Sequence, residues 1–212
     1  MEPAHDQNVN DDDYSGPRKL INENSSGTII VWENIDNELI KATKNETITD
    51  IWIRGINHIR MTFGKFMTDR GNINIWLNGE KIQPWDPFAS DISEVVITED
   101  YPIESIVKIS GFVLPHRKKL TDEQIEEYKG PKGWNAQQGF YLYRNKRLIV
   151  SGEWFGLYQQ EEHYKLARIQ IDIDNVSDSE WGLDFKKTKV IPSEAIKEEL
   201  KRIADIVRTR AQ

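Results

Sequence analysis

The chain has 212 residues, of which 38% are hydrophobic and 30% are charged, and its formal net charge is −7 at pH 7. This acidic balance argues against a general nucleic-acid coat protein, although it leaves room for a local basic face. The sequence has no Cys, which excludes disulfides, thiolate chemistry and zinc sites with cysteine ligands.

The N-terminal region is polar and acidic. Residues 1–26 include three consecutive aspartates, at 11–13, and almost no apolar face. We expect a flexible tail or linker here. A signal peptide would be basic and then apolar, and no apolar run approaches the roughly 18 residues of a membrane span. We therefore expect a cytoplasmic protein without a membrane partner.

The first apolar segments predict a strand and a helix. The β-branched run "GTIIVWENI" (27–35) follows a Ser-Ser-Gly break and is typical of a buried strand. Large apolar residues then recur at spacings of 4, 3, 4 and 3, which predicts one amphipathic helix ending near Gly71. These residues are Trp52, Ile56, Ile59, Phe63 and Phe66.

Two segments have the pattern of β-hairpins. In "INIWLNGEKI" (73–82), Asn78-Gly79 is a strong turn signal between two short strands. In "GFYLYRNKRLIV" (139–150), the turn is centred on Asn145-Lys146. The period-2 pattern of this second hairpin predicts that its aromatic residues mostly pack inside, with a core of Phe140, Leu142, Leu148 and Val150.

Further strands are predicted at 105–115 and at 164–174. The second alternates cleanly, with Ile169, Ile171 and Ile173 on one face. Its opposite face carries the polar residues Arg168, Gln170 and Asp172.

Two later helices carry capping signals. Thr121 with Gln124 forms a capping-box pattern before a helix that ends at Gly130. Ser193 caps a closing helix (193–210) with an apolar face. The order of elements predicts an α+β fold, in which helices pack on a mixed sheet. The apolar face of the last helix comprises Ile196, Leu200, Ile203 and Val207.

No catalytic constellation stands out in the sequence. It lacks a G-x-x-x-x-G-K-[ST] phosphate loop, a G-x-G-x-x-G motif and a G-x-S-x-G motif. The four His residues are far apart and none pairs with a carboxylate at metal-binding spacing. We therefore expect neither a metal site nor a complete enzyme active site.

Two basic clusters are candidate phosphate contacts. The first is "PHRKKLT", with Arg117, Lys118 and Lys119, and the second is "DFKKTKV", just before the last helix. Lysines on a loop that follows a rigid strand can reach a phosphate as point charges. Spacing alone favours a solvated loop over a phosphate contact for both clusters. The lysines of the second cluster are Lys186, Lys187 and Lys189.

The run "QQGFYLYRNKRLI" resembles the transducer domain of GHKL-type ATPases, the superfamily of gyrase B, MutL and MORC proteins. That family has a strand of the form G-F-x-[VI]-Y, a tight basic turn and an R-L-I return. The longer strings "IWLNGEKIQPWDPFASD", "GFVLPHRKKL" and "WGLDFKKTKVIP" are similar to bacterial ATPases of the same superfamily. The resemblance therefore covers about residues 27–210. The residues that fit the short pattern are Gly139, Phe140, Tyr143, Arg147, Leu148 and Ile149.

The resemblance implies a fold and a role. A transducer has a ribosomal-protein-S5-domain-2-like fold, expected here for 27–212, and follows a Bergerat nucleotide-binding domain. It extends one lysine toward the γ-phosphate of ATP from the loop before a late helix. Lys187 is the first candidate for that lysine, followed by Lys189 and then Lys186.

The Bergerat motifs are missing from this chain, which has no D-x-G-x-G sequence. The resemblance therefore implies that the chain is not an active ATPase alone and holds no cofactor by itself. ATP and Mg²⁺ would be bound by a nucleotide domain in the same or a separate chain. A homodimer is a further expected partner state.

Two alternative functions remain open from the residues. One is a dimerisation or other protein-binding domain whose exposed aromatics are buried on a partner. The other, not favoured by the net charge, is a nucleic-acid-binding face with Trp134 or Tyr141 available for stacking. Its basic residues would be Arg54, Arg60, Lys65, Arg117, Lys118, Lys119, Arg144, Lys146 and Arg147.

Overall fold

The computed structural model describes residues 19, 27–31, 47–68, 73–103, 105–174, 181 and 190–212. The chain divides into two compact units, Met1–Trp52 with Ile75–Lys81, and Ile53–Asn74 with Ile82–Gln212. The expected tail at 1–26 lies outside the described residues, apart from residue 19.

The first unit contains the short hairpin predicted around Asn78-Gly79. Strands β1 (Trp76–Leu77) and β2 (Glu80–Lys81) pair in antiparallel fashion. Asn78 and Gly79 have φ angles of 49° and 82°, which is the left-handed geometry that a two-residue hairpin turn requires.

The strand predicted at 27–35 is wrong over 27–31, where the backbone has no regular structure; residues 32–35 lie outside the described residues. Ile29, Ile30 and Val31 are 37%, 74% and 45% exposed. A β-branched run forms a strand when a neighbouring strand and a packed face support it. Neither is present for these residues within the described part of the chain.

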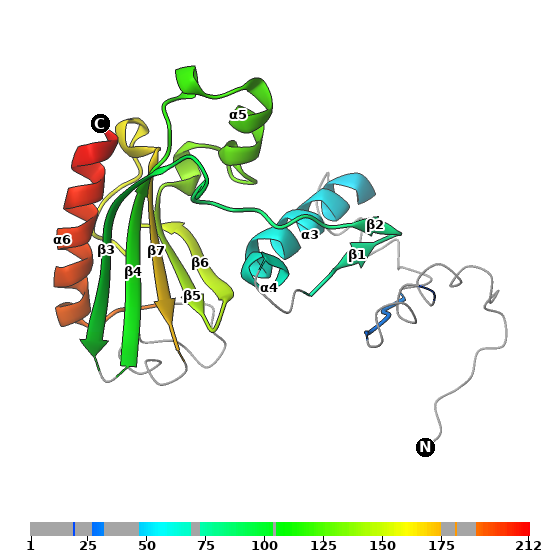
Figure 1. Ribbon diagram of the computed structural model, residues 1–212, viewed down its shortest axis with the longest axis horizontal. Helices are drawn as coiled ribbons and strands as arrows, with labels where there is room; N and C mark the ends of the chain where they lie inside the picture. The colour runs from blue at the N-terminus through cyan, green and yellow to red at the C-terminus, as the bar shows by residue number, and fades with distance from the viewer. Residues whose placement is uncertain are drawn as a thin grey trace. The chain divides into compact units, whose positions relative to one another are not determined.

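The second unit is built on a five-stranded sheet with the order β3-β4-β7-β5-β6 (Figure 1). All neighbouring pairs are antiparallel except β5 and β7, which are parallel. This mixed sheet with packed helices confirms the α+β class. The strands are β3 (Glu94–Ile103), β4 (Ser105–Val113), β5 (Gly139–Arg144), β6 (Arg147–Glu153) and β7 (Ala167–Ile173).

The amphipathic segment before the sheet forms two helices, α3 (Ile48–Thr62) and α4 (Gly64–Thr68). The prediction of one continuous helix was therefore wrong at Phe63. A Cβ on Gly64 would lie 3.3 Å from the carbonyl oxygen of Trp85. The close approach of that distant backbone explains why a glycine stands at the start of α4.

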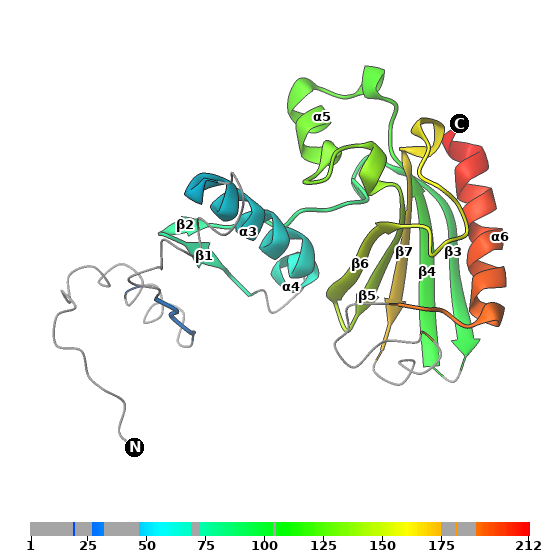
Figure 2. The ribbon, with the colours of Figure 1, turned by 180° about the vertical axis from the view of Figure 1, so that it is seen from behind.

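The last helix, α6 (Glu194–Ala211), covers one face of the sheet (Figure 2). Ser193 caps it, since its Oγ accepts from the backbone N–H of Ile196 at 3.5 Å. All four predicted apolar positions of this helix are at most 5% exposed. They pack against the residues of β4, β5 and β7 that face the same way, which include Val107, Ile109, Phe140, Leu142, Ile169 and Ile171.

The opposite face of the sheet carries an aromatic cluster. The loop before β3 lays Trp85 and Phe88 on Phe112, Tyr141 and Tyr143. The chain between β4 and β5 forms η2 (Arg117–Lys119), α5 (Asp122–Lys129) and η3 (Asn135–Gln137), and η4 (Glu162–Tyr164) precedes β7. The predicted capping box of α5 is confirmed in both of its hydrogen bonds.

Candidate functional site

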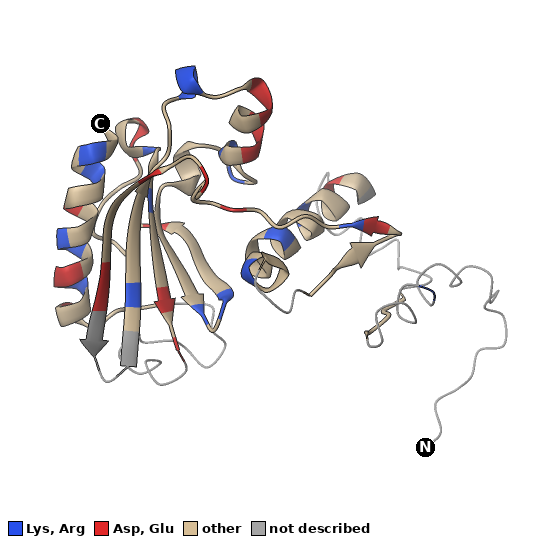
Figure 3. Ribbon diagram, in the orientation of Figure 1, with Lys and Arg blue, Asp and Glu red and all other residues tan. Residues whose placement is uncertain are grey.

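One end of the sheet gathers basic residues from the second hairpin. Arg144 is the register partner of Ile173, the last residue of β7. The backbone N–H of Asn145 donates to the carbonyl oxygen of Ile173 at 3.0 Å. The turn between β5 and β6, which carries Lys146 and Arg147, therefore lies beside the C-terminal end of β7 (Figure 3).

The predicted γ-phosphate lysines, Lys186, Lys187 and Lys189, lie outside the described residues. The residues that flank them are described. Trp181 is 1% exposed in the core on the α6 face. The backbone N–H of Ile191 donates to the carbonyl oxygen of Trp181 at 3.2 Å. Residues 181 and 191 therefore lie next to each other.

The other basic cluster, Arg117–Lys119, lies at the opposite end of the sheet. It follows β4, whose last residue, Val113, pairs with Ala167 at the start of β7. The six residues of β7 beyond Ala167 span about 20 Å. The structure therefore separates Arg117, Lys118 and Lys119 from the hairpin turn instead of joining them into one basic face.

A polar contact ties the C-terminal end of β7 to α4. Lys65 of α4 forms an ion pair with Asp172 of β7. Its Nζ also lies 4.0 Å from the ring centroid of Tyr143. Asp172 accepts a second hydrogen bond from the Nε2 of Gln170 at 2.5 Å. Both charged side chains are partly covered, with 23% and 32% of their surface exposed.

Tyr143 is almost fully buried beneath this ion pair, at 3% exposure. Burial raises the pKa of its hydroxyl well above the usual value, and Tyr141, Asp86 and Asp172 raise it further. The phenol therefore stays neutral at physiological pH. The contact of Lys65, Asp172 and Tyr143 suits mechanical coupling of two elements more than proton transfer.

Sequence reasoning named Lys65 only as one of nine basic residues and missed its pairing with Asp172. The alternation of β7 placed Asp172 on the polar face, but nothing local indicates which element covers that face. The two partners are 107 positions apart in the sequence, which explains why no spacing motif could reveal the pair.

The alternative nucleic-acid face loses several of its proposed contacts. Tyr141 is 0% exposed, so the idea that it stacks on a base is wrong. Arg60 donates to Glu127 at 2.7 Å and to the carbonyl oxygen of Gln83 at 3.0 Å. Trp134 is half-buried.

Within the described residues, no group of three or more His, Cys, Asp or Glu side chains could hold a metal ion. Across that same part of the chain, no helix has the length and apolar character needed to cross a membrane.

No protein-family model matches the chain, and no curated protein or solved structure matches it. The resemblance to GHKL transducers therefore stays a prediction.

Proposed function

We propose that this chain is the transducer domain of a GHKL-type ATPase. It senses ATP held by a nucleotide-binding domain, in the same or a separate chain, and relays that state to dimerisation or to an effector. The sensing group is a lysine of the segment 182–189, with Lys187 preferred over Lys189 and Lys186.

One observation carries the proposal. The lysine segment is flanked by Trp181 and Ile191, which are joined by a backbone hydrogen bond, and both Trp181 and Val190 pack in the core on the α6 face. A lysine on a segment between two such residues can reach a phosphate as a point charge. The basic turn of the second hairpin lies at the C-terminal end of β7, the strand that leads toward this segment.

The relay follows from the packing. Trp181 and the buried residues of α6 share one core with β4, β5 and β7. If the lysine segment shifts toward a phosphate, the strands and the helix that share this core move together, because tightly packed elements shift as one rigid body. The pair of Lys65 and Asp172 extends this connection to α4. ATP biases the equilibrium between the two arrangements by binding one of them better.

The first test measures ATP turnover with the nucleotide-binding domain supplied. We expect the chain alone to hydrolyse no ATP. In the reconstituted protein, Lys187→Ala should lower turnover by about 100-fold, the cost of removing one group that stabilises developing charge, with only a modest loss of ATP binding.

The matched control is Lys118→Ala, which removes a lysine at the opposite end of the sheet and should leave turnover unchanged. If Lys189→Ala has the large effect instead, the lysine assignment moves by two positions. If Lys186→Ala, Lys187→Ala and Lys189→Ala all leave turnover unchanged, the proposed function is wrong.

The second candidate is a nucleic-acid-binding module, and the exposed Lys146 and Arg147 at one end of the sheet favour it. Such contacts with phosphates should still hold at about 50 mM salt. A duplex or single strand that fails to bind at this salt concentration would eliminate this candidate. Loss of binding in Arg147→Ala but not in Arg117→Ala would support it.

A further inference from the structure

Arg168 is a fully buried cation near the start of the central strand β7, with 0% of its surface exposed. It lies on β7 between Phe112 of β4 and Gly139 of β5, its register partners. Its Nη1 donates to the carbonyl oxygens of Lys165 and Ala167, at 2.6 Å and 3.2 Å. Its Nε and Nη2 have no hydrogen-bond partner.

Phe88 covers the strand that carries this guanidinium. Its ring centroid lies 4.9 Å from that of Phe112 and 5.3 Å from that of Tyr141. Because β7 lies between β4 and β5 in the sheet, a side chain that touches both neighbours spans β7 on the face of Arg168. The turn that holds Phe88 is fixed by Asp86, whose carboxylate accepts from the N–H groups of Phe88 and Ser90 at 2.9 Å and 2.8 Å.

The polar groups around Arg168 include unpartnered donors and one acceptor, the hydroxyl oxygen of Tyr141, which interacts favourably with the guanidinium. The hydroxyl of Tyr141 is directed to Gln137, whose carbonyl oxygen and Oε1 both lie at 2.8 Å. The Nε2 of Gln137 is a further buried donor without a partner. Among the described residues no carboxylate forms an ion pair with Arg168. Such a set of donors matches an anion and repels a cation.

Stability does not account for this arrangement. A buried charge without a counter-charge is costly, and an apolar side chain of similar size is often as good or better for the folded state. Burial lowers the pKa of Arg168 and the interaction with Tyr141 opposes that effect, but a guanidinium stays charged in proteins. Natural proteins keep a few costs of this kind at functional sites.

We propose that the Nε–Nη2 edge of Arg168 binds a carboxylate, which enters when Phe88 swings away from Phe112 and Tyr141. The two hydrogen bonds donated by Nη1 orient the guanidinium, and the edge formed by Nε and Nη2 points away from those acceptors. That edge presents two parallel N–H groups, the geometry that a carboxylate accepts in bidentate fashion. Ala89, beside Phe88, has a φ of 44°, a left-handed conformation that is unfavourable for a residue with a Cβ.

The test needs neither ATP nor a nucleotide domain, so its result is independent of the proposed function. Thermal unfolding of the whole chain is measured with sodium formate, sodium acetate or sodium chloride at matched ionic strength. We expect formate and acetate to raise the melting temperature more than chloride does, and both shifts to vanish in Arg168→Met and in Arg168→Lys. Lysine keeps the positive charge but lacks the two parallel N–H groups of the guanidinium.

Two further measurements make the result decisive. Without any carboxylate, the melting temperature of Arg168→Met should equal or exceed that of the unsubstituted chain. A decrease of more than about 10 °C would mean that Arg168 stabilises the fold. That result would overturn the proposal. If Arg168→Met fails to fold, Arg168→Lys decides: an unchanged formate shift in that variant overturns the proposal, and a lost shift supports it.

The source of the carboxylate is distinguished by size. Triglycine and its C-terminal amide differ only in the free carboxylate. Stabilisation by triglycine and not by the amide identifies a chain terminus as the class of ligand. A shift with formate and acetate alone identifies a small acid. If no carboxylate exceeds chloride, the proposal is wrong.

Discussion

The two faces of the five-stranded sheet differ in the polarity of the side chains that they bury. On the α6 side, β7 contributes Ile169, Ile171 and Ile173, each at most 4% exposed, and their neighbours in the core are apolar. On the other side, the same strand contributes Arg168, Gln170 and Asp172. These polar side chains are covered in part by aromatic rings, and Arg168 is covered completely.

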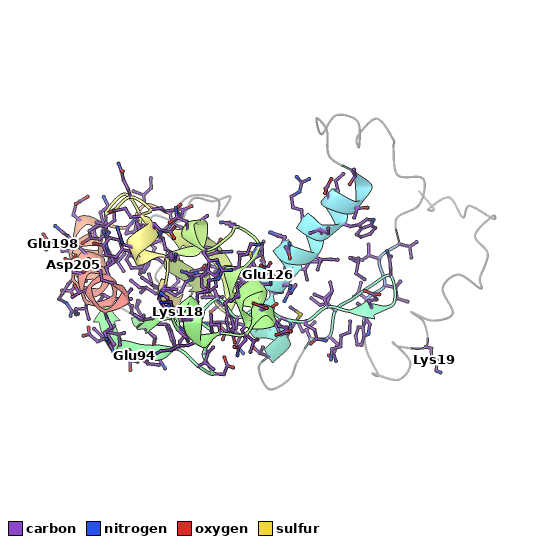
Figure 4. All side chains as sticks on the ribbon, turned by 90° about the horizontal axis from the view of Figure 1, so that it is seen from above. Lys19, Glu94, Lys118, Glu126, Glu198 and Asp205 are labelled. Atoms are coloured by element: carbon purple, nitrogen blue, oxygen red, sulfur yellow. The ribbon has the colours of Figure 1, made fainter. Side chains whose placement is uncertain are left out.

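The two faces therefore differ in how they contribute to the stability of the fold. The α6 face holds the fold together mainly through apolar packing, and Arg208 is the buried charged residue of this helix, paired with Glu161 at 3.4 Å. Arg210 pairs with Glu94 of β3 at 2.8 Å, and Tyr158 donates to Asp205 of α6 (Figure 4 labels both acids). The opposite face keeps charged groups where they cost stability. The proposed carboxylate site at Arg168 and the ion pair of Lys65 and Asp172 lie on that face, and the predictions below test the contrast.

The largest expected effect lies in the apolar core. Leu200 is 0% exposed on the inner side of α6. Leu200→Ala should lower the free energy of unfolding by about 2–5 kcal/mol, through lost burial and a residual cavity. Ile206→Ala is the control on the same helix, since Ile206 is 37% exposed, and it should change the value by about 0.5 kcal/mol or less. Urea unfolding measures both, and equal costs would contradict the assignment of this face.

The next effect comes from overpacking. A Cβ on Gly111 of β4 would lie 2.4 Å from Val207 Cγ2 and 2.8 Å from Ile97 Cγ2. Gly111→Ala should therefore destabilise the fold by about 1–3 kcal/mol. Gly55→Ala makes a control of opposite sign, because nothing lies within 4 Å of the added Cβ in α3 and alanine should stabilise this helix by about 0.5–1 kcal/mol. A neutral Gly111→Ala would mean that α6 does not pack this closely.

A smaller effect is expected for the pair of Lys65 and Asp172 on the opposite face. A double-mutant cycle with Lys65→Met and Asp172→Asn should give a coupling energy of about 1 kcal/mol, since both side chains are partly covered. The pair of Lys129 and Glu126, at 3.0 Å and with 46% and 71% of its side chains exposed, should give about 0.3–0.5 kcal/mol. A coupling energy of zero for the first pair would remove the proposed link between β7 and α4.

The smallest effect depends on pH. Burial raises the pKa of Tyr158 to about 12, and its hydrogen bond to Asp205 contributes. Because the folded pKa lies above the unfolded value of about 10, the folded state favours the neutral phenol. This contribution to stability is complete below pH 10 and is lost as the pH rises through about 12.

The measurement compares the free energy of unfolding of the unsubstituted chain and of Tyr158→Phe across this alkaline range. The phenylalanine variant should lose less stability over the same interval. Parallel pH profiles for the two proteins would show that this hydroxyl does not carry the effect.

Local signals predicted the elements that depend on local chemistry. The turns at Asn78-Gly79 and Asn145-Lys146, the capping box at Thr121 and the amphipathic α6 are all present. The strand β3 was not predicted, because "EVVITEDYPI" mixes acids and a proline with its apolar residues. It is an edge strand, and its pairing with β4 fixes it.

The candidate sites depended on contacts that no local pattern contains. The break at Phe63 reflects the backbone of Trp85 beside Gly64. The period of β7 correctly separated Arg168 from the isoleucines, but it could not show that Phe88 comes from about 80 residues earlier to cover that strand. Lys186, Lys187 and Lys189 stay a prediction, since they lie outside the described residues.

The most direct test of the coupling proposal is hydrogen exchange on the chain with its nucleotide-binding domain, with and without a non-hydrolysable ATP analogue. We predict slower amide exchange in 182–189 and in the 144–147 turn, and unchanged exchange in 117–119. Protection of 117–119 without any protection of 182–189 would show that nucleotide engages the other end of the sheet, and would contradict the account.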